Sequence, residues 1–263
     1  MLGVDIYLLV NNIYVWGRFA GPPVGSIYNI PPDYLMRTYY SERINVNKHK
    51  PFIALSVQGE MGSLTPEEMG SYFKVIYTPV SYISTPHKES VMIELEKAES
   101  YYEKQPLKEN KKRCAFNMLQ CSHIPKEGIE TIPDYLYLKV ILINDILQLG
   151  LFTSQKLEKG AWVGTYAGEV FPSDYPSRSL HAMRIFDPTT QSNLQVDAKN
   201  TGNHTRFCNH SYNPNVVNKL AFYKGMYHVI LYTLRVIEPH EQLLYNYGKD
   251  YWENLGVEPQ ALS

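Results

Sequence analysis

The residues that could do chemistry lie in three separated groups in the second half of the chain. The first group is rich in glycine, the second contains an Asn-His pair, and the third ends in two tyrosines. Glycine lets a backbone pass close to a ligand, and tyrosine combines apolar area with one hydroxyl, which suits an amphipathic channel. Any one group alone could be an ordinary polar turn. The inference therefore rests on all three, which are Leu149–Phe152 with Tyr166–Glu169, Arg206–Asn215, and Glu241–Gly248.

The three groups resemble the motifs of the SET-domain family, in that family's own order. In the first group, Leu149–Phe152 (LGLF) is similar to G-x-G-L-F, and Tyr166–Glu169 (YAGE) is similar to Y-x-G-E. In the second, Arg206–Asn215 (RFCNHSYNPN) is similar to RFxNHSxxPN. In the third, Glu241–Gly248 (EQLLYNYG) is similar to E-E-L-x-Y-D-Y-G. The resemblance covers residues 136–252.

This resemblance implies transfer of a methyl group from S-adenosylmethionine to a protein lysine, which leaves S-adenosylhomocysteine. Such a transfer is a direct displacement, so the site has to align donor and acceptor. Asn209 and His210 are expected to hold the amino-acid and adenine parts of the cofactor. Backbone groups of Leu149 and Leu151 are expected on the other side. The remaining residues that the resemblance assigns to cofactor binding are Gly150, Arg206, Phe207 and Trp252.

The resemblance also implies a narrow channel for the acceptor lysine, lined by Tyr166, Tyr245 and Tyr247. Only a neutral amine can attack, whereas a free lysine has a pKa of about 10.4. An apolar channel beside a sulfonium cation disfavours the charged amine. Tyr247 is expected to orient the amine through its hydroxyl. A hydroxyl at Tyr245 would crowd the amine and favour mono-methylation, although ordinary strand packing of Tyr245 is the alternative.

Several positions depart from the family pattern and leave a second interpretation open. Gln148 stands where the first glycine of G-x-G is expected, Ala182 lies where many relatives carry a tyrosine, and His240 precedes Glu241 in place of glycine. The alternative is therefore an inactive SET-fold module that binds other proteins. No cysteine-rich segment precedes Leu136 or follows Gly248, so no zinc is expected, and Tyr251-Trp252 are the aromatic residues that could close the pocket.

The elements that must position these residues are mainly β-strands. Short β-prone runs punctuated by turns follow Pro133, which indicates a domain of several small sheets. The resemblance to the SET family implies that the segments around Asn209-His210 and the closing tyrosines cross in a knot-like arrangement. The first part of the chain reads as an α+β region, with strands at residues 1–16, 52–58 and 72–83, the last broken at Pro79, and a helix from about Glu89 to Lys104. We expect an N-terminal region (1–105), a linker (106–135), the SET domain (136–252) and a tail (253–263).

Composition supports a packed globular chain, since 44% of the residues are hydrophobic and only 19% are charged. The net charge of −1 argues against broad attraction to nucleic acid, so the expected partner is a protein presenting a lysine, such as a histone. With three cysteines a disulfide framework is not indicated, and Cys114, Cys121 and His123 lack an obvious fourth zinc ligand.

No segment predicts a membrane span, since the apolar N-terminus is too short for one. We therefore expect a soluble, intracellular protein. The basic run at residues 108–113 is either a nuclear localisation signal or a solvated loop. A histone substrate would place the protein in the nucleus.

Overall fold

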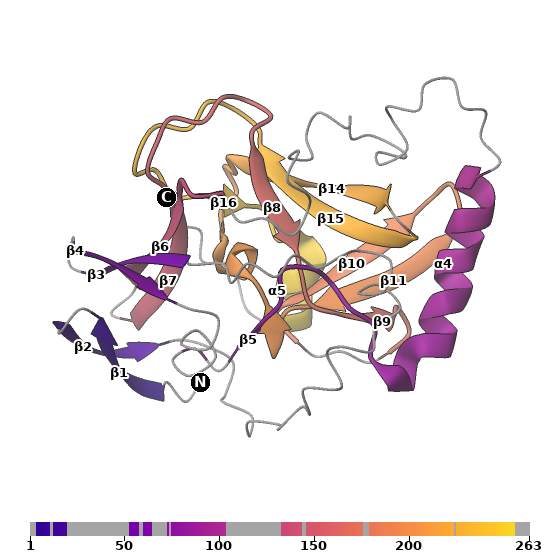
Figure 1. Ribbon diagram of the computed structural model, residues 1–263, viewed down its shortest axis with the longest axis horizontal. Coiled ribbons are helices and arrows are strands. Elements are labelled where there is room, and N and C mark those ends of the chain that lie inside the picture. The colour runs from indigo at the N-terminus through magenta and orange to yellow at the C-terminus, as the bar shows by residue number, and fades with distance from the viewer. Residues whose placement is uncertain are drawn as a thin grey trace.

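The structure is a computed structural model and describes ten ranges: 4–10, 13–19, 53–57, 60–64, 73, 75–103, 133–143, 146–175, 179–223 and 225–255. Within them the chain is mainly β, with several small sheets and two α-helices (Figure 1). This confirms the predicted fold class. None of the helices in these ranges has the length and hydropathy of a membrane span.

One sheet joins strands of residues 4–64 to strands of residues 136–153, in the order β1-β2-β7-β6-β3-β4 (left in Figure 1). Three antiparallel hairpins make it, and the parallel pairs β2–β7 and β3–β6 join them. Strands of the first hundred residues therefore continue a sheet of the SET segment, while the division at residues 105 and 135 remains a prediction. The bounds are β1 (Val4–Val10), β2 (Ile13–Phe19), β3 (Ile53–Val57), β4 (Glu60–Leu64), β6 (Leu136–Ile143) and β7 (Ile146–Thr153).

Two three-stranded sheets form the core on the other side of the molecule. In β10 and β11 buried residues alternate with more exposed ones, so one face of that sheet is turned to the core. Strands β14 and β15 form an antiparallel hairpin in which Tyr223 pairs with Met226, and Gly225 between them takes the positive φ of 76° that tight hairpin turns favour. The strands are β9 (Glu169–Pro172), β10 (Ala182–Asp187) and β11 (Ser192–Asp197) in one sheet, and β8 (Trp162–Tyr166), β14 (Val216–Tyr223) and β15 (Met226–Thr233) in the other.

Helix α4 (Lys88–Glu103) confirms the predicted helix and packs against β9 and β11 (right in Figure 1). Its buried side chains recur three or four residues apart, which places them on one face, and they join the core of the SET segment. The carboxylate of Glu94 accepts a hydrogen bond from the Asn193 amide at 3.0 Å. The helix is therefore part of this domain's core. Its buried residues are Val91, Leu95, Ala98 and Tyr102.

Asp187 fixes the end of α4 to the sheet and provides a test of that packing. This buried carboxylate accepts hydrogen bonds from the hydroxyls of Tyr102 (2.6 Å) and Tyr227 (2.8 Å). Although burial raises the pKa of Asp187, these bonds and others from Thr189 and Thr190 hold it below its ordinary value.

We expect Asp187→Ala to lower the free energy of unfolding by about 3 kcal/mol, because two tyrosine hydroxyls lose their acceptor. Chemical denaturation at neutral pH measures this, with exposed Asp174→Ala as the matched control. The charge-dependent part of the difference is present above the unfolded pKa of about 4 and is lost as pH falls through the lower folded pKa. Equal stabilities of the two variants would contradict the assignment.

The strand predicted at residues 72–83, broken at Pro79, is found only in part, as β5 (Ile76–Tyr77) and an isolated parallel bridge between Tyr82 and Glu169. Phe73 is helical, and the 3-10 helix η1 (Thr85–His87) follows soon after. Pro79 lacks the amide proton that a ladder needs, and the Thr78 hydroxyl donates to the Val80 carbonyl at 2.6 Å. The short β5 pairs in parallel with β12 (Thr201–Gly202), so this segment also contacts residues of the range 136–252.

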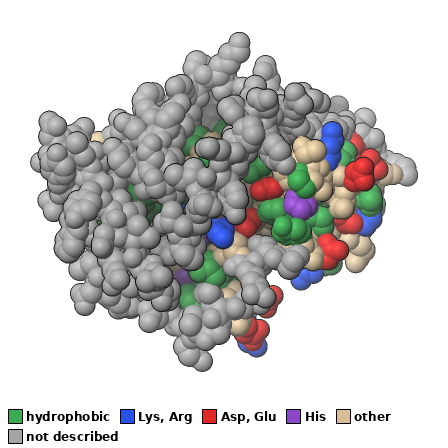
Figure 2. Space-filling model, turned by 90° about the horizontal axis from the view of Figure 1, so that it is seen from below, with side chains coloured by type: hydrophobic (Ala, Val, Ile, Leu, Met, Phe, Trp, Pro, Cys, Tyr) green, Lys and Arg blue, Asp and Glu red, His purple; other side chains and the backbone are tan. Residues whose placement is uncertain are grey.

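The described part of the surface seen from below the view of Figure 1 is mixed in character (Figure 2). Acidic, basic and hydrophobic side chains lie among one another there. This agrees with a formal net charge of −1 for the whole chain.

Candidate active site

Two short strands bring the second and third motifs side by side. Strand β13 (Asn209–His210) pairs in parallel with β16 (Leu244–Tyr245), and we call this pair the crossing. Beyond it, the Ser211 amide donates to the Tyr245 carbonyl at 3.1 Å. Parallel pairing between segments more than thirty residues apart places the Asn-His pair next to the closing tyrosines.

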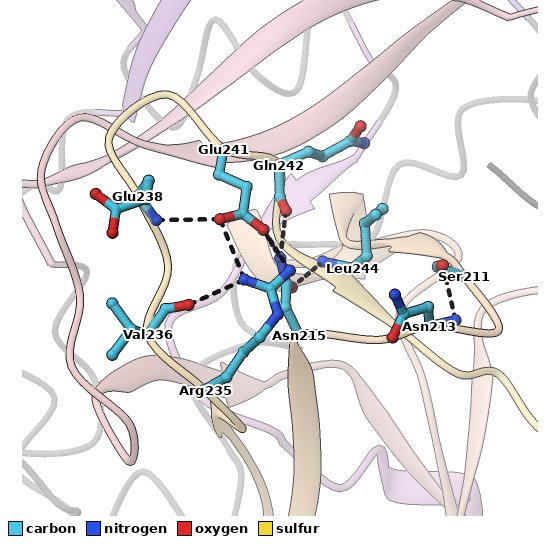
Figure 3. Close-up of polar contacts among 9 residues, drawn as sticks. All are labelled: Ser211, Asn213, Asn215, Arg235, Val236, Glu238, Glu241, Gln242 and Leu244. Carbon is cyan, nitrogen blue, oxygen red and sulfur yellow. Dashed lines mark hydrogen bonds and ion pairs between the residues drawn. The ribbon is translucent and has the colours of Figure 1, made fainter. Parts of the chain in front are cut away.

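Asn215 holds the chain that enters the crossing. Its side-chain Nδ2 donates to the Gln242 carbonyl (2.8 Å) and to Glu241 Oε1 (3.0 Å), and its Oδ1 accepts from the Leu244 amide (2.8 Å). Arg235 pairs with the same Glu241 carboxylate through both terminal nitrogens (Figure 3). Although burial raises the pKa of Glu241, Arg235 and the other donors lower it below its ordinary value, so the acid stays charged.

We expect Asn215→Ala to lower the free energy of unfolding by about 2–3 kcal/mol, because a buried amide with three partners is removed. Thermal and chemical unfolding would measure this. Asn213→Ala is the matched control, since Asn213 is exposed in the same loop and uses only its backbone amide, toward Ser211. Equal losses for the two alanine variants would contradict the anchoring role.

His240 adopts the turn conformation for which the family pattern has glycine. Its φ of 65° is left-handed and costs a non-glycine residue of order 1 kcal/mol. Its amide donates to the Thr153 carbonyl at 2.7 Å, and its Nδ1 lies 3.1 Å from the Tyr137 hydroxyl. The turn is thus kept without glycine, and these contacts offset the strain.

The cofactor half of the site is formed around His210. Burial lowers the pKa of this histidine, which keeps the ring neutral, and its Nδ1 accepts from the Tyr247 amide at 3.1 Å. The proton of the neutral ring is thereby assigned to Nε2, which is buried and has no partner among the described residues. Trp252 on α5 (Lys249–Leu255) places its ring 4.9 Å from that of His210, and its buried Nε1 also lacks a partner there.

These groups fit the nucleoside and amino-acid parts of S-adenosylmethionine. Buried donors without partners are costly unless a ligand accepts their hydrogen bonds, and His210 and Trp252 present two of them side by side. Asn209 donates through Nδ2 to the Leu149 carbonyl at 3.1 Å, which keeps its amide oxygen as an acceptor. His210, Trp252 and Asn209 would therefore hold the cofactor.

A group of tyrosines lies around Tyr247. The Tyr247 hydroxyl donates to the Cys208 carbonyl at 2.8 Å, and the Tyr245 and Tyr251 rings each lie 4.7 Å from its ring. Tyr166 is buried and donates to the His181 carbonyl at 2.8 Å. Burial raises the pKa of Tyr166, Tyr245 and Tyr247, so these phenols stay neutral.

The remaining predicted cofactor residues are placed in structural roles, and their cofactor contacts stay a prediction. Arg206 donates from Nε to the Ala198 carbonyl at 2.9 Å, and burial lowers its pKa to about 10. Phe207 packs in the core against Phe73, with ring centroids 5.7 Å apart. The Leu151 carbonyl accepts from the Leu243 amide at 2.7 Å.

Two residues at the site were not assigned to it by sequence. Gln242 lies against Gly150, and the His181 carbonyl accepts the hydrogen bond of the Tyr166 hydroxyl. Burial, together with Arg206 and Lys199, lowers the pKa of His181 to about 3. The family motif includes the position of Gln242, whereas His181 lies in no motif. Tyr251, which was expected with Trp252 to close the pocket, joins the tyrosine group.

In the described ranges no group of three or more His, Cys, Asp or Glu side chains could hold a metal ion. Cys114, Cys121 and His123 lie outside these ranges. The expectation of a site without zinc therefore stays a prediction.

Comparison with known proteins places the three motifs in one family. Residues 148–248 match the family described as "SET domain". The chain is 35% identical over 128 residues to "Histone-lysine N-methyltransferase trithorax" of Drosophila virilis, an alignment that covers 45% of this chain and 3% of that protein. It is 32% identical over 117 residues to "Histone-lysine N-methyltransferase MEDEA" of Arabidopsis thaliana, which covers 41% of this chain and 17% of that protein. The chain thus spans only a small part of these relatives.

Two similar solved structures are titled "crystal structure of KRYPTONITE in complex with mCHG DNA and SAH" and "crystal structure of KRYPTONITE in complex with mCHH DNA, H3(1-15) peptide and SAH". The first has a TM-score of 0.38 and 23% identity, and covers 46% of this chain and 25% of that one. The second has a TM-score of 0.35 and 22% identity, and covers 44% and 24%.

Proposed function

Because residues 148–248 form a SET domain, we propose that the chain transfers a methyl group from S-adenosylmethionine to the side-chain amine of a protein lysine. The observation that carries this proposal is the crossing, which brings the unpartnered donors of His210 and Trp252 together with neutral tyrosines around Tyr247. Cofactor and lysine would then meet beside Tyr247, in the alignment that a direct displacement requires.

The cofactor would supply a methyl group on a sulfonium, whose carbon–sulfur electrons return to sulfur as the lysine amine forms the new carbon–nitrogen bond. The protein's part is to receive a neutral amine and aim it. A site lined by half-buried, neutral tyrosines disfavours the ammonium form, because it offers little solvation and no counter-charge. Tyr247, whose proton is held by the Cys208 carbonyl, presents an oxygen that can accept from the amine.

Binding of S-adenosylhomocysteine to the purified protein tests the cofactor half of this proposal. Isothermal titration calorimetry should give one site per chain, and His210→Ala should weaken it about tenfold or more by removing a buried donor. Absence of any heat with the wild-type chain would overturn the proposal. Binding without transfer to any protein would instead favour the inactive protein-binding module.

We further propose that Tyr245 restricts the product to mono-methyl-lysine. Tyr245 lies half-buried at the crossing between Tyr247 and the core, where its hydroxyl would occupy space near the amine. Tyr245→Phe should therefore raise the fraction of di- and tri-methylated product several-fold with little change in total transfer, as measured by mass spectrometry of the product peptide. Tyr101→Phe, on the exposed end of α4, is the control. An unchanged product distribution would contradict this role.

The substrate class follows from the relatives named above, which are histone-lysine methyltransferases. We propose a histone or another lysine-bearing protein as the substrate, and a nuclear location where it is a histone. The near-zero net charge supports a protein partner rather than nucleic acid. Screening core histones and a whole lysate with labelled cofactor would identify the target.

A further inference from the structure

The side chain of Gln242 lies directly over the backbone of Gly150. A Cβ at Gly150 would lie 2.5 Å from Gln242 Nε2 and 3.1 Å from its Cδ, closer than side chains pack. The two segments are also bridged as an antiparallel pair, Phe152 with Gln242. Glycine at position 150 thus allows the carboxamide of Gln242 to reach the strand that carries the first motif.

Gln242 is anchored through its backbone, but its side-chain amide nitrogen lacks a hydrogen-bond partner among the described residues. Its backbone carbonyl accepts from Asn215, and Figure 3 shows the side chain directed away from the Arg235–Glu241 pair. Its Nε2 is buried and has no hydrogen-bond partner in the part of the chain that the structure describes. A buried donor without a partner is costly, which is consistent with a ligand that supplies the acceptor.

Two side chains beside Leu149 and Gly150 offer one acceptor and one donor, which suit the ammonium and the carboxylate of an amino acid. Asn209 is tied to the neighbouring Leu149 carbonyl through Nδ2, so its amide oxygen can accept from an ammonium group. Gln242 Nε2 offers the complementary donor, which suits a carboxylate. A glutamate, which the family motif has here, would present only acceptors to that carboxylate.

We propose that Gln242 is a specificity-determining residue that binds the carboxylate of the methyl donor through Nε2. This inference rests on the proposed function, because it names a further contact for the same cofactor. Gln242 then selects ligands that carry the amino-acid carboxylate over those that lack it.

The test compares S-adenosylhomocysteine with its decarboxylated analogue by calorimetry on the full chain. Gln242→Leu should weaken binding of S-adenosylhomocysteine about 10- to 100-fold, the value of a charge-assisted hydrogen bond, and leave the analogue within about twofold. Gln242→Glu should weaken it at least as much through repulsion. Gln155→Leu and Gln155→Glu make the same changes at an exposed glutamine and should alter neither affinity.

Thermal unfolding without ligand gives an independent readout. Since Nε2 has no described partner, Gln242→Leu should leave the melting temperature unchanged or raise it, whereas loss of a structural contact would lower it. Equal loss of affinity for both ligands, or no loss, would overturn the role of Gln242 and leave the proposed function standing. A wild-type chain that binds neither ligand would overturn both.

Discussion

Tyr247→Phe is expected to lower the rate of methyl transfer at least about a hundredfold and to leave the affinity for S-adenosylhomocysteine within about twofold. The substitution removes the hydroxyl that we propose to orient the amine but retains the ring that contacts His210 and Trp252. The rate is measured with labelled S-adenosylmethionine under single-turnover conditions, and the affinity by calorimetry.

The matched control is Tyr135→Phe, because the Tyr135 hydroxyl also donates to a backbone carbonyl, that of Trp162, at 2.6 Å. Each variant loses one hydrogen bond of this kind, which should lower the free energy of unfolding by about 1 kcal/mol. Only Tyr247→Phe should also lose methyl transfer. If both variants transferred methyl groups at the wild-type rate, Tyr247 would be a structural residue and the proposed mechanism would be wrong.

The second large effect is expected at Gly168, where a side chain would enter the backbone of another strand. A Cβ there would lie 2.2 Å from the Asp197 carbonyl oxygen and 2.6 Å from its carbon. The Gly168 carbonyl also accepts from the Tyr82 amide at 3.1 Å, so three segments meet at this point. Because backbone cannot move aside cheaply, Gly168→Ala should destabilise the fold by about 3–5 kcal/mol.

Gly248→Ala is the informative contrast in the same unfolding experiment. Gly248 has a φ of +88°, but a Cβ there would meet no described atom within 4 Å, so its alanine variant carries only conformational strain of about 1 kcal/mol. At Gly168 the backbone has no positive φ, but an added Cβ would collide with the backbone of Asp197. Equal losses at the two glycines would show that close backbone approach is not what Gly168 permits.

Much of the local structure could be predicted from the sequence because it depends on neighbouring residues. The helix expected from about Glu89 to Lys104 is α4, and the β-prone runs expected after Pro133 are found as short strands. The parallel pairs β2–β7, β3–β6 and β5–β12 could not be predicted, because periodicity shows which face of a strand is buried but does not identify its partner. That is why the contribution of the first hundred residues to the SET part became visible only in three dimensions.

The candidate site was predicted to the extent that it follows a motif. The crossing places Asn209 and His210 beside Tyr245, as the order of the motifs indicated. Gln242 was in view as part of a motif, but its amide could be assigned a role only once its burial and its lack of a described partner were known. Tyr251 was expected with Trp252 to close the pocket, but its ring contact with Tyr247 depends on how α5 packs.

Localised mass spectrometry of a methylated substrate tests the central claim most directly. Core histones and a lysate are incubated with the wild-type chain and isotopically labelled S-adenosylmethionine, and the modified peptides are fragmented. The account predicts labelled methyl groups on lysine side chains, mainly one per lysine, that are lost with Tyr247→Phe. A wild-type chain that binds S-adenosylhomocysteine but labels no lysine, or labels other side chains instead, would contradict it.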